Sequence, residues 1–484
     1  MSKKEPATVK KRRAKSSKSR RGCYTCKVRR VKCDETKPIC VRCGKTGRLC
    51  EGFGYSKPLL NHQDHRADHL SPISSRTFQT KDEYRHFEYF RHHALLYLTG
   101  FDNQSRFWNE TVLQLSEASP AVLHAVLALS ALYEHLDGSS KGELAPDKLA
   151  LQHYNRSIKH LRQAPSSHPI EFALTSCILF IAFESARDDH KMALFHLQNG
   201  LSIMNDWRTK EVKSFESCQT REDISEMLRR LDMQATTFLN SRQPYLAATV
   251  DVELLDNNSG SSMLFSSLRS AQLSLDKIEI RLFYILTTKS STMQLPWAGF
   301  SNCATSRQVL LQGIKARFAQ WKKAFDDFSE HEANNMNARD LKLLLLLELH
   351  YQTTSLMLDL QGDISSVSSS SNAQCTRINE LSKNLILASS NPKSTFLVDT
   401  GIIAPLYFAA TTTSCVFIRQ QSLDLLRSIT WKEGLWDSRI VVQIAEHLSV
   451  VGKSGLVRTA VSGGVPELAD MFLLAPDPAR RSRF

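Results

Sequence analysis

Six of the eleven cysteines of this 484-residue chain fall within one short segment near its N-terminus. Residues 23–50 read CYTCKVRRVKCDETKPICVRCGKTGRLC. The spacing C-x2-C-x6-C occurs twice, and each cysteine of the first half returns 17 residues later. The six cysteines are Cys23, Cys26, Cys33, Cys40, Cys43 and Cys50. The segment is therefore an internal repeat of one cysteine-bearing half.

This cysteine spacing predicts a zinc site. Structural zinc prefers four ligands in a tetrahedron, and cysteine doublets commonly supply them. Six thiolates can complete two tetrahedra if two of the sulfurs bridge both ions. The symmetry of the repeat favours Cys23 and Cys40, the first cysteine of each half, as the bridging ligands. We therefore expect two structural Zn²⁺ ions per chain, held by all six cysteines.

Two other structures would also use these cysteines. The first is a disulfide framework. It is disfavoured because we find no secretory signal and because strongly basic flanks are not typical of an exported segment. The second is a single four-cysteine zinc ribbon with two spare thiols, which the 17-residue repeat disfavours. A count of two zinc ions per chain would support the two-ion cluster, and a count of one would contradict it.

The net charge of +13 is concentrated at the N-terminus. Residues 1–50 contain 18 Lys and Arg against 3 Asp and Glu, whereas the remainder has a net charge of −2. A basic arm on a near-neutral body is typical of nucleic-acid-binding proteins. We expect residues 1–22 to be a disordered arm that contacts phosphates and directs nuclear import, with a merely solvated tail as the alternative. Its basic clusters consist of Lys10, Lys11, Arg12, Arg13, Lys15, Lys18, Arg20 and Arg21.

The cysteine segment closely resembles the zinc binuclear cluster, the DNA-binding module of fungal transcription factors. The six cysteines, the basic run KVRRVK at 27–32 and Pro38 carry the resemblance. It implies that the basic run is a short helix whose end enters the major groove and reads CGG-like triplets. It also implies that the DNA contacts come from Lys27, Arg29, Arg30 and Lys32.

Within this set, we expect the two arginines to contact base edges. A guanidinium group can pair with O6 and N7 of guanine together, whereas the lysines suit contacts with phosphates or with the negative charge of the cluster. Relatives very often carry lysine where Arg30 stands, so the base contact at this position departs from the usual pattern.

The rest of the chain is predicted to be helical. Residues 51–80 are expected to form a linker without a heptad pattern. From residue 81, apolar residues recur every three or four positions, and Ser119 followed by Pro120 predicts a helix start. We therefore expect an all-α regulatory domain over residues 81–475, followed by a tail at 476–484. Serine-rich loops are expected near 256–270 and 361–374.

This body resembles the helical regulatory region found in fungal zinc cluster factors. Four stretches carry the resemblance: ALQHYNRSIKHLR at 150–162, FHLQNGLSIM at 195–204, GIIAPLYFAATTTSC at 401–415 and WKEGLWDS at 431–438. The chain departs from relatives after Cys415, where Val416 and Phe417 stand in place of charged residues. The resemblance implies a domain that regulates, dimerises or recruits partners.

Together these features predict a nuclear, sequence-specific, DNA-binding transcription regulator of RNA polymerase II genes, with a metabolic or biosynthetic gene cluster among its expected targets. The expected partners are double-stranded DNA, a second copy of the chain, and the transcription machinery or co-regulators. We expect neither an enzyme nor a membrane protein, because no HExxH or dinucleotide motif and no membrane-length apolar run occurs. The alternatives are a metal- or redox-responsive sensor and a nucleic-acid-binding scaffold without sequence specificity.

Overall fold

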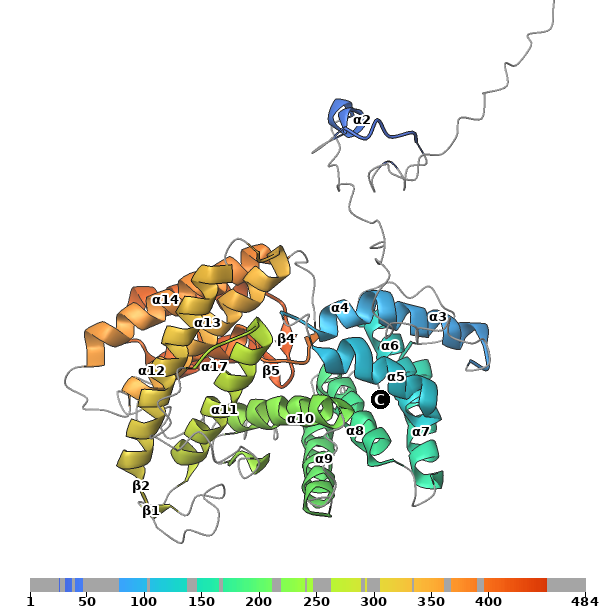
Figure 1. The fold of residues 1–484 in the computed structure, drawn as a ribbon, viewed down its shortest axis with the longest axis horizontal. Coiled ribbons are helices and arrows are strands. Elements are labelled where there is room, and N and C mark those ends of the chain that lie inside the picture. The colour runs from blue at the N-terminus through green and yellow to red at the C-terminus, as the bar shows by residue number, and fades with distance from the viewer. Residues whose placement is uncertain are drawn as a thin grey trace, which may run out of the picture. The chain divides into compact units, whose positions relative to one another are not determined.

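The chain divides into two compact units, Met1–Ser74 and Ser75–Phe484 (Figure 1). The first contains the cysteine segment, and the second contains nearly all of the helices. The expected order of a small cysteine module followed by a helical domain is confirmed. The computed structural model describes residues 26, 31–36, 40–46, 78–101, 105–136, 146–164, 169–210, 219–239, 242–246, 263–288, 292–293, 305–332, 335–360, 367–389 and 396–450.

The first part of the helical unit is built around two buried helices, α6 (Pro120–Leu136) and α8 (Ile170–Ala186). Both are apolar on almost every side, which is expected of helices at the centre of a core. Helix α7 packs along α6, and α9 packs along α8 (Figure 1). The surrounding elements are α3 (Lys81–Tyr89), the π-helical turn η1 (Phe90–Ala94), α4 (Leu95–Leu98), the π-helical turn η2 (Phe107–Thr111), α5 (Val112–Ala118), α7 (Pro146–Gln163) and α9 (His190–Lys210).

Helix α10 (Gln219–Phe238) connects the two parts of this unit, because it contacts α8 and α9 as well as α11 (Leu268–Thr287). In the second part, α13 packs against α11 and α14, while α15 packs against α14, α16 and α17. These helices are α12 (Arg307–Glu332), α13 (Ala338–Asp359), α14 (Val367–Ala388), α15 (Ile403–Thr412), α16 (Val416–Arg427) and α17 (Ser438–Val450).

Five two-residue strands accompany the helices in the described residues. The strands β1 (Thr292–Met293) and β2 (Thr305–Ser306) pair antiparallel. In a second sheet, β3 (Phe396–Leu397) runs parallel to β4 (Lys432–Glu433), and β4 pairs antiparallel with β5 (Trp436–Asp437). The domain is therefore mostly helical, as expected, with short strands that join distant parts of the chain.

The four stretches that resemble the regulatory region meet in pairs. Glu433 of β4 is fully buried and accepts hydrogen bonds of 2.8, 2.9 and 3.0 Å from the backbone N–H groups of residues 401–403, at the start of α15. The hydroxyl of Tyr154 on α7 lies 2.8 Å from Nε2 of His196 on α9. These residues therefore hold separate segments of the domain together.

Several predicted boundaries can be compared with the structure. Helix α3 begins at Lys81, as expected, and the Thr80 side chain accepts a hydrogen bond from the N–H of Glu83. Helix α6 also begins at the expected Pro120. The Ser119 side chain does not cap it, because its buried Oγ makes no hydrogen bond within the described residues.

The serine-rich segment at 361–374 differs from the expected loop. Helix α14 begins at Val367, so the serines at 368–371 belong to the helix. Its face with Cys375, Ile378, Leu381 and Leu385 is buried, and this packing outweighs the low helix propensity of serine. Helix α11 likewise begins at Leu268, within the other predicted loop.

The basic arm at 1–22, most of the linker at 51–80 and the tail at 476–484 lie outside the described residues, and their boundaries stay predictions. Within the described residues, no helix is both long enough and apolar enough to cross a membrane.

Candidate metal centre and nucleic-acid interface

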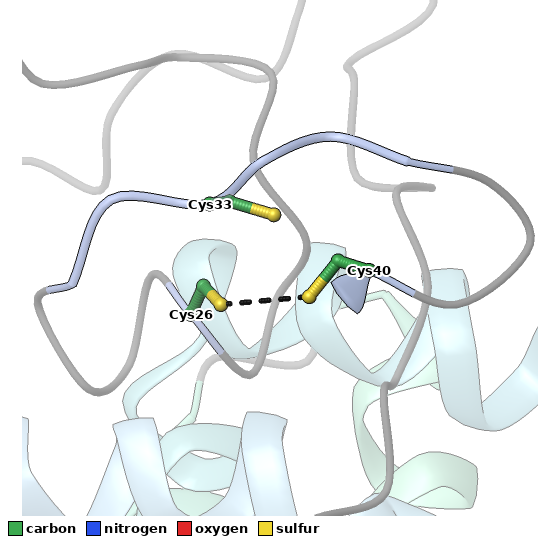
Figure 2. Close-up of side chains that lie close together, drawn as sticks. All are labelled: Cys26, Cys33 and Cys40. Atoms are coloured by element: carbon green, nitrogen blue, oxygen red, sulfur yellow. Dashed lines mark hydrogen bonds between the residues drawn. The ribbon is translucent and has the colours of Figure 1, made fainter. Parts of the chain in front are cut away.

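Four cysteines of the N-terminal segment bring their sulfur atoms into one small buried core. Cys26, Cys33, Cys40 and Cys43 are at most 5% exposed, and Val31 packs against them. Figure 2 shows the side chains of Cys26, Cys33 and Cys40 converging, and their sulfur atoms lie within 4.8 Å of one another. Residues from both halves of the repeat therefore meet at one point.

The spacing of these sulfurs fits zinc. The Sγ atom of Cys26 lies 3.8 Å from that of Cys40 and 3.9 Å from that of Cys43. In a zinc tetrahedron with Zn–S bonds of about 2.3 Å, neighbouring sulfurs stand about 3.8 Å apart. Cys40 of the second half groups with two cysteines of the first, and Cys26 of the first half lies equally near Cys43 of the second. Cys23 and Cys50 lie outside the described residues, so the bridging pair and the full ligand set stay predictions.

Asp34 connects the two halves of the module. It follows Cys33 in the first half, yet its carboxylate accepts hydrogen bonds of 2.9 Å from the N–H groups of Val41 and Arg42. These N–H groups begin α2 (Val41–Lys45), the helix that carries Cys43. The hydroxyl of Thr36 and these N–H groups hold the pKa of Asp34 well below its ordinary value. The carboxylate is therefore charged at the positive end of the helix, where a negative charge is favourable.

Backbone N–H groups also point at the ligand sulfurs. The N–H of Glu35 lies 3.4 Å from Sγ of Cys33, and the N–H of Cys43 lies 3.3 Å from Sγ of Cys40. Such contacts stabilise thiolates, the form of cysteine that binds zinc. Glu35 adopts a φ of 62°, which the tight turn between Asp34 and Thr36 requires.

Exposed cationic side chains surround the sulfur core. Lys32, Arg42 and Lys45 are exposed, and Nη1 of Arg42 donates a 2.9 Å hydrogen bond to the carbonyl of Lys32. Lys32 is thus the member of the predicted DNA-contacting set that the structure describes. Lys27, Arg29, Arg30 and all eight residues of the predicted import signal lie outside the described residues.

The sequence interpretation missed Asp34, although a signal for it is present. Asp34 stands seven residues before the first residue of α2, and aspartate is a common helix-capping residue. It can cap α2 only because the chain between them folds back, and the fold alone shows that it does.

Two family models match the chain. Residues 21–58 match the fungal Zn(2)-Cys(6) binuclear cluster domain, and residues 85–446 match the fungal specific transcription factor domain. The first of these domains binds two structural zinc ions, so the expected metal content is confirmed.

Curated relatives cover different parts of the chain. The aspercryptin biosynthesis cluster-specific transcription regulator atnN of Emericella nidulans is 24% identical over 382 residues, which cover 69% of this chain and 59% of that protein. The transcription regulator lscL of Purpureocillium lilacinum is 29% identical over 209 residues, or 38% of this chain and 48% of that protein. The transcriptional regulatory protein moc3 of Schizosaccharomyces pombe is 66% identical over 32 residues, or 7% of this chain and 6% of that protein.

The matched part of this chain thus spans less than two thirds of the length of either of the first two relatives. No solved structure matches the chain. The family is nevertheless clear, because the fungal specific transcription factor model covers most of the helical unit and the cluster model covers the sulfur core that precedes it. This chain belongs to the family of fungal-specific transcription factors with an N-terminal Zn(2)-Cys(6) binuclear cluster.

Proposed function

We propose that this protein is a nuclear regulator of RNA polymerase II transcription that binds CGG-like triplets in double-stranded DNA. The two zinc ions supply rigidity, and the protein side chains make the contacts to DNA. Arg29 and Arg30 are proposed to contact base edges, and Lys27 and Lys32 to contact phosphates. We assign the chain a binding role and no catalytic one.

The observation that carries this proposal is the buried sulfur core with cations around it. Lys32, Arg42 and Lys45 are exposed on a module whose described core consists of four cysteines and Val31. A compact cationic module suits the phosphate backbone, and the adjoining basic arm adds further cations. The family of the chain supports the same function.

Selection of binding sites from randomised duplex DNA tests this function directly. The zinc-loaded full-length protein is used at near-physiological salt, since affinities for DNA depend strongly on salt. Enrichment of two GC-rich triplets at fixed spacing is expected and would also support a homodimer. One enriched triplet would indicate a monomer or a reader that needs a partner. No enrichment, despite two bound zinc ions, would contradict sequence-specific recognition.

The substitution Arg30→Ala separates base readout from phosphate contact. If Arg30 pairs with guanine, the variant is expected to lose roughly 1–3 kcal/mol of binding free energy on the selected triplet and little on unrelated DNA. The variant Lys27→Ala is the matched control, because loss of a phosphate contact weakens binding to all sequences alike. An equal loss on all sequences for Arg30→Ala would place its side chain on phosphate.

The basic arm is proposed to direct nuclear import. A fluorescent fusion that lacks residues 3–21 has lost all eight clustered cations of the arm. It is therefore expected to accumulate outside the nucleus. A fusion that stays fully nuclear would contradict the import role and leave the arm with phosphate contacts alone.

The target genes are proposed to belong to a biosynthetic gene cluster. The names of two relatives support this, since one regulates the aspercryptin cluster and another is the pestheic acid cluster transcriptional regulator 3 of Pestalotiopsis fici. The latter is 36% identical over 73 residues, or 14% of this chain and 13% of that protein. Loss of the gene is expected to change transcript levels of one group of adjacent genes, which RNA sequencing measures. Changes scattered over the genome would contradict a cluster-specific role.

A further inference from the structure

A buried group of two histidines and one carboxylate lies in the helical unit. Glu83 on α3, His124 on α6 and His153 on α7 each bring one potential ligand atom to within 4.8 Å of the others. Their side chains belong to residues that are only 2%, 4% and 3% exposed. The Nδ1 atoms of the two histidines face each other at 3.1 Å. Because the three residues come from three helices, the group forms only in the packed domain.

The ligand types and distances suit a metal ion of the zinc class. Imidazole nitrogen is a good ligand for zinc, copper, nickel and iron, and two histidines with one glutamate form a known three-residue zinc site. In a tetrahedron with Zn–N bonds of about 2.0 Å, neighbouring ligand atoms stand about 3.3 Å apart. The two Nδ1 atoms, which share a hydrogen bond in the absence of an ion, are 3.1 Å apart, close to this value. The histidines can therefore share an ion with little movement of their helices.

The group is closed off from solvent, since its three residues are almost fully buried. Other groups approach Glu83: the N–H of Gln79 donates to its Oε2 at 2.7 Å, and Nη1 of Arg156 lies 3.5 Å from its Oε1. An ion would share the carboxylate with Arg156, whose side chain is 52% exposed and can turn toward solvent.

We propose that Glu83, His124 and His153 form a binding site for one divalent transition-metal ion between α3, α6 and α7. This ion is additional to the two zinc ions of the cysteine cluster and uses nitrogen and oxygen ligands instead of sulfur. Three protein ligands leave one position of a tetrahedron for water or another small ligand. The ion would join α3, the first helix of the domain, to the central helix α6.

Cobalt(II) is the probe that distinguishes this site from the cluster. Zinc binds more tightly than cobalt to a given site, so the full-length protein loaded with two zinc ions keeps its cluster filled when Co²⁺ is added. We expect one Co²⁺ to bind per chain, with d–d absorption and without the charge-transfer band that thiolate ligands produce. Failure to bind Co²⁺, or a thiolate charge-transfer band, would overturn the proposal.

Two matched substitutions locate the ion. His153→Asn removes one ligand and is expected to weaken Co²⁺ binding at least about tenfold. His135→Asn changes an exposed histidine on α6, outside the group, and is expected to leave binding unchanged. Co²⁺ should also raise the melting temperature of the unchanged protein and of His135→Asn, but not that of His153→Asn. Equal binding by all three proteins would overturn the assignment.

A second ligand variant covers the case in which His153→Asn does not fold. Glu83→Gln keeps an oxygen that can accept the hydrogen bond from Gln79 while it removes the negative charge. It is expected to fold, with a cooperative melt in the presence of a chelator, and to bind Co²⁺ at least about tenfold more weakly than the unchanged protein. Unchanged Co²⁺ affinity in this variant would overturn the proposed ligand set.

Discussion

Asp34 stabilises the cysteine module although it is not one of the predicted metal ligands. Its carboxylate ties the end of the first half to the first N–H groups of α2, and the neighbouring N–H of Glu35 points at Sγ of Cys33. Hydrogen bonds of this kind orient metal ligands, and their loss typically lowers metal affinity. Retention of zinc should therefore depend on this one exposed side chain.

Replacing Asp34 with alanine tests this role. Asp34→Ala removes the cap of α2, and its zinc affinity is expected to fall about tenfold. Competition with a coloured zinc chelator measures the affinity. Asp34→Asn, which keeps an acceptor oxygen without the charge, should lie between the alanine variant and the unchanged protein. Equal zinc affinities for all three would show that the cap is dispensable.

Glu433 is a second residue with a specific electrostatic role. Burial raises its pKa to about 7, against the three backbone N–H groups of residues 401–403 that lower it. In the unfolded chain the ordinary value is 4.5. At pH values between 4.5 and about 7, Glu433 is therefore protonated in the folded protein but deprotonated in the unfolded chain. This residue therefore makes the free energy of unfolding fall as the pH rises from about 4.5 to about 7.

The substitution Glu433→Gln should remove this dependence. From pH 4.5 to pH 7, the unchanged protein is expected to lose roughly 2–4 kcal/mol of stability relative to the variant. Urea unfolding at several pH values measures both proteins. All other titratable groups are the same in the two proteins, so the difference between the two curves isolates Glu433. Parallel curves would contradict the raised pKa.

At the scale of elements, the hairpin of β4 and β5 depends on one glycine. Gly434 is the first residue of a two-residue turn and has a φ of 54°, a conformation that other residues rarely adopt. A Cβ atom at this position would collide with the side chain of Gln234 on α10. That side chain donates a 2.9 Å hydrogen bond to the carbonyl of Val398. The turn, α10 and the segment after β3 are therefore packed together.

Gly434→Ala is expected to destabilise the domain by roughly 1–3 kcal/mol, because it adds both backbone strain and a collision. Gly313 on α12 is the matched control, since a Cβ atom there meets nothing within 4 Å. Gly313→Ala should raise the stability by about 0.5–1 kcal/mol through helix propensity. Chemical denaturation measures both variants. A loss of stability at residue 313 as large as that at 434 would contradict the explanation.

The contrast between local and distant contacts explains what the sequence could predict. The cysteine ligands are close in sequence, so their spacing alone indicated the metal. Apolar periodicity indicated the start of α3, and Ser119 followed by Pro120 indicated the start of α6. The start of α14 was missed because distant packing determines it. His124 and His153 lie 29 residues apart on different helices, and no short motif joins them. Glu433 and the N–H groups it accepts from are likewise separated by about thirty residues.

At the scale of the whole molecule, metal removal should affect the two units differently. The described core of the first unit consists of four cysteines and Val31, too little apolar surface to fold without metal. The helical unit has an extensive apolar core of its own. Chelation is therefore expected to unfold the cysteine module and leave the helical unit folded.

Limited proteolysis with mass spectrometry checks this expectation. With chelator, new cleavages should occur within residues 23–50, while a resistant fragment that begins after residue 74 should persist. The zinc-loaded protein under the same protease is the control. Loss of the resistant fragment together with the module would show that the two units fold as one.

The sheet around β3 ties early and late parts of the chain together. The hydroxyl of Tyr133 on α6 donates a 2.7 Å hydrogen bond to the carbonyl of Phe396, 263 residues later. Lys432 pairs with Asp188, 244 residues before it. A ribosome that adds 5–20 residues per second needs roughly 12–50 s to make such a stretch. During that time the first helices of the domain lack these contacts. We therefore expect chaperones and proteases to act on the N-terminal part of the domain mainly during synthesis.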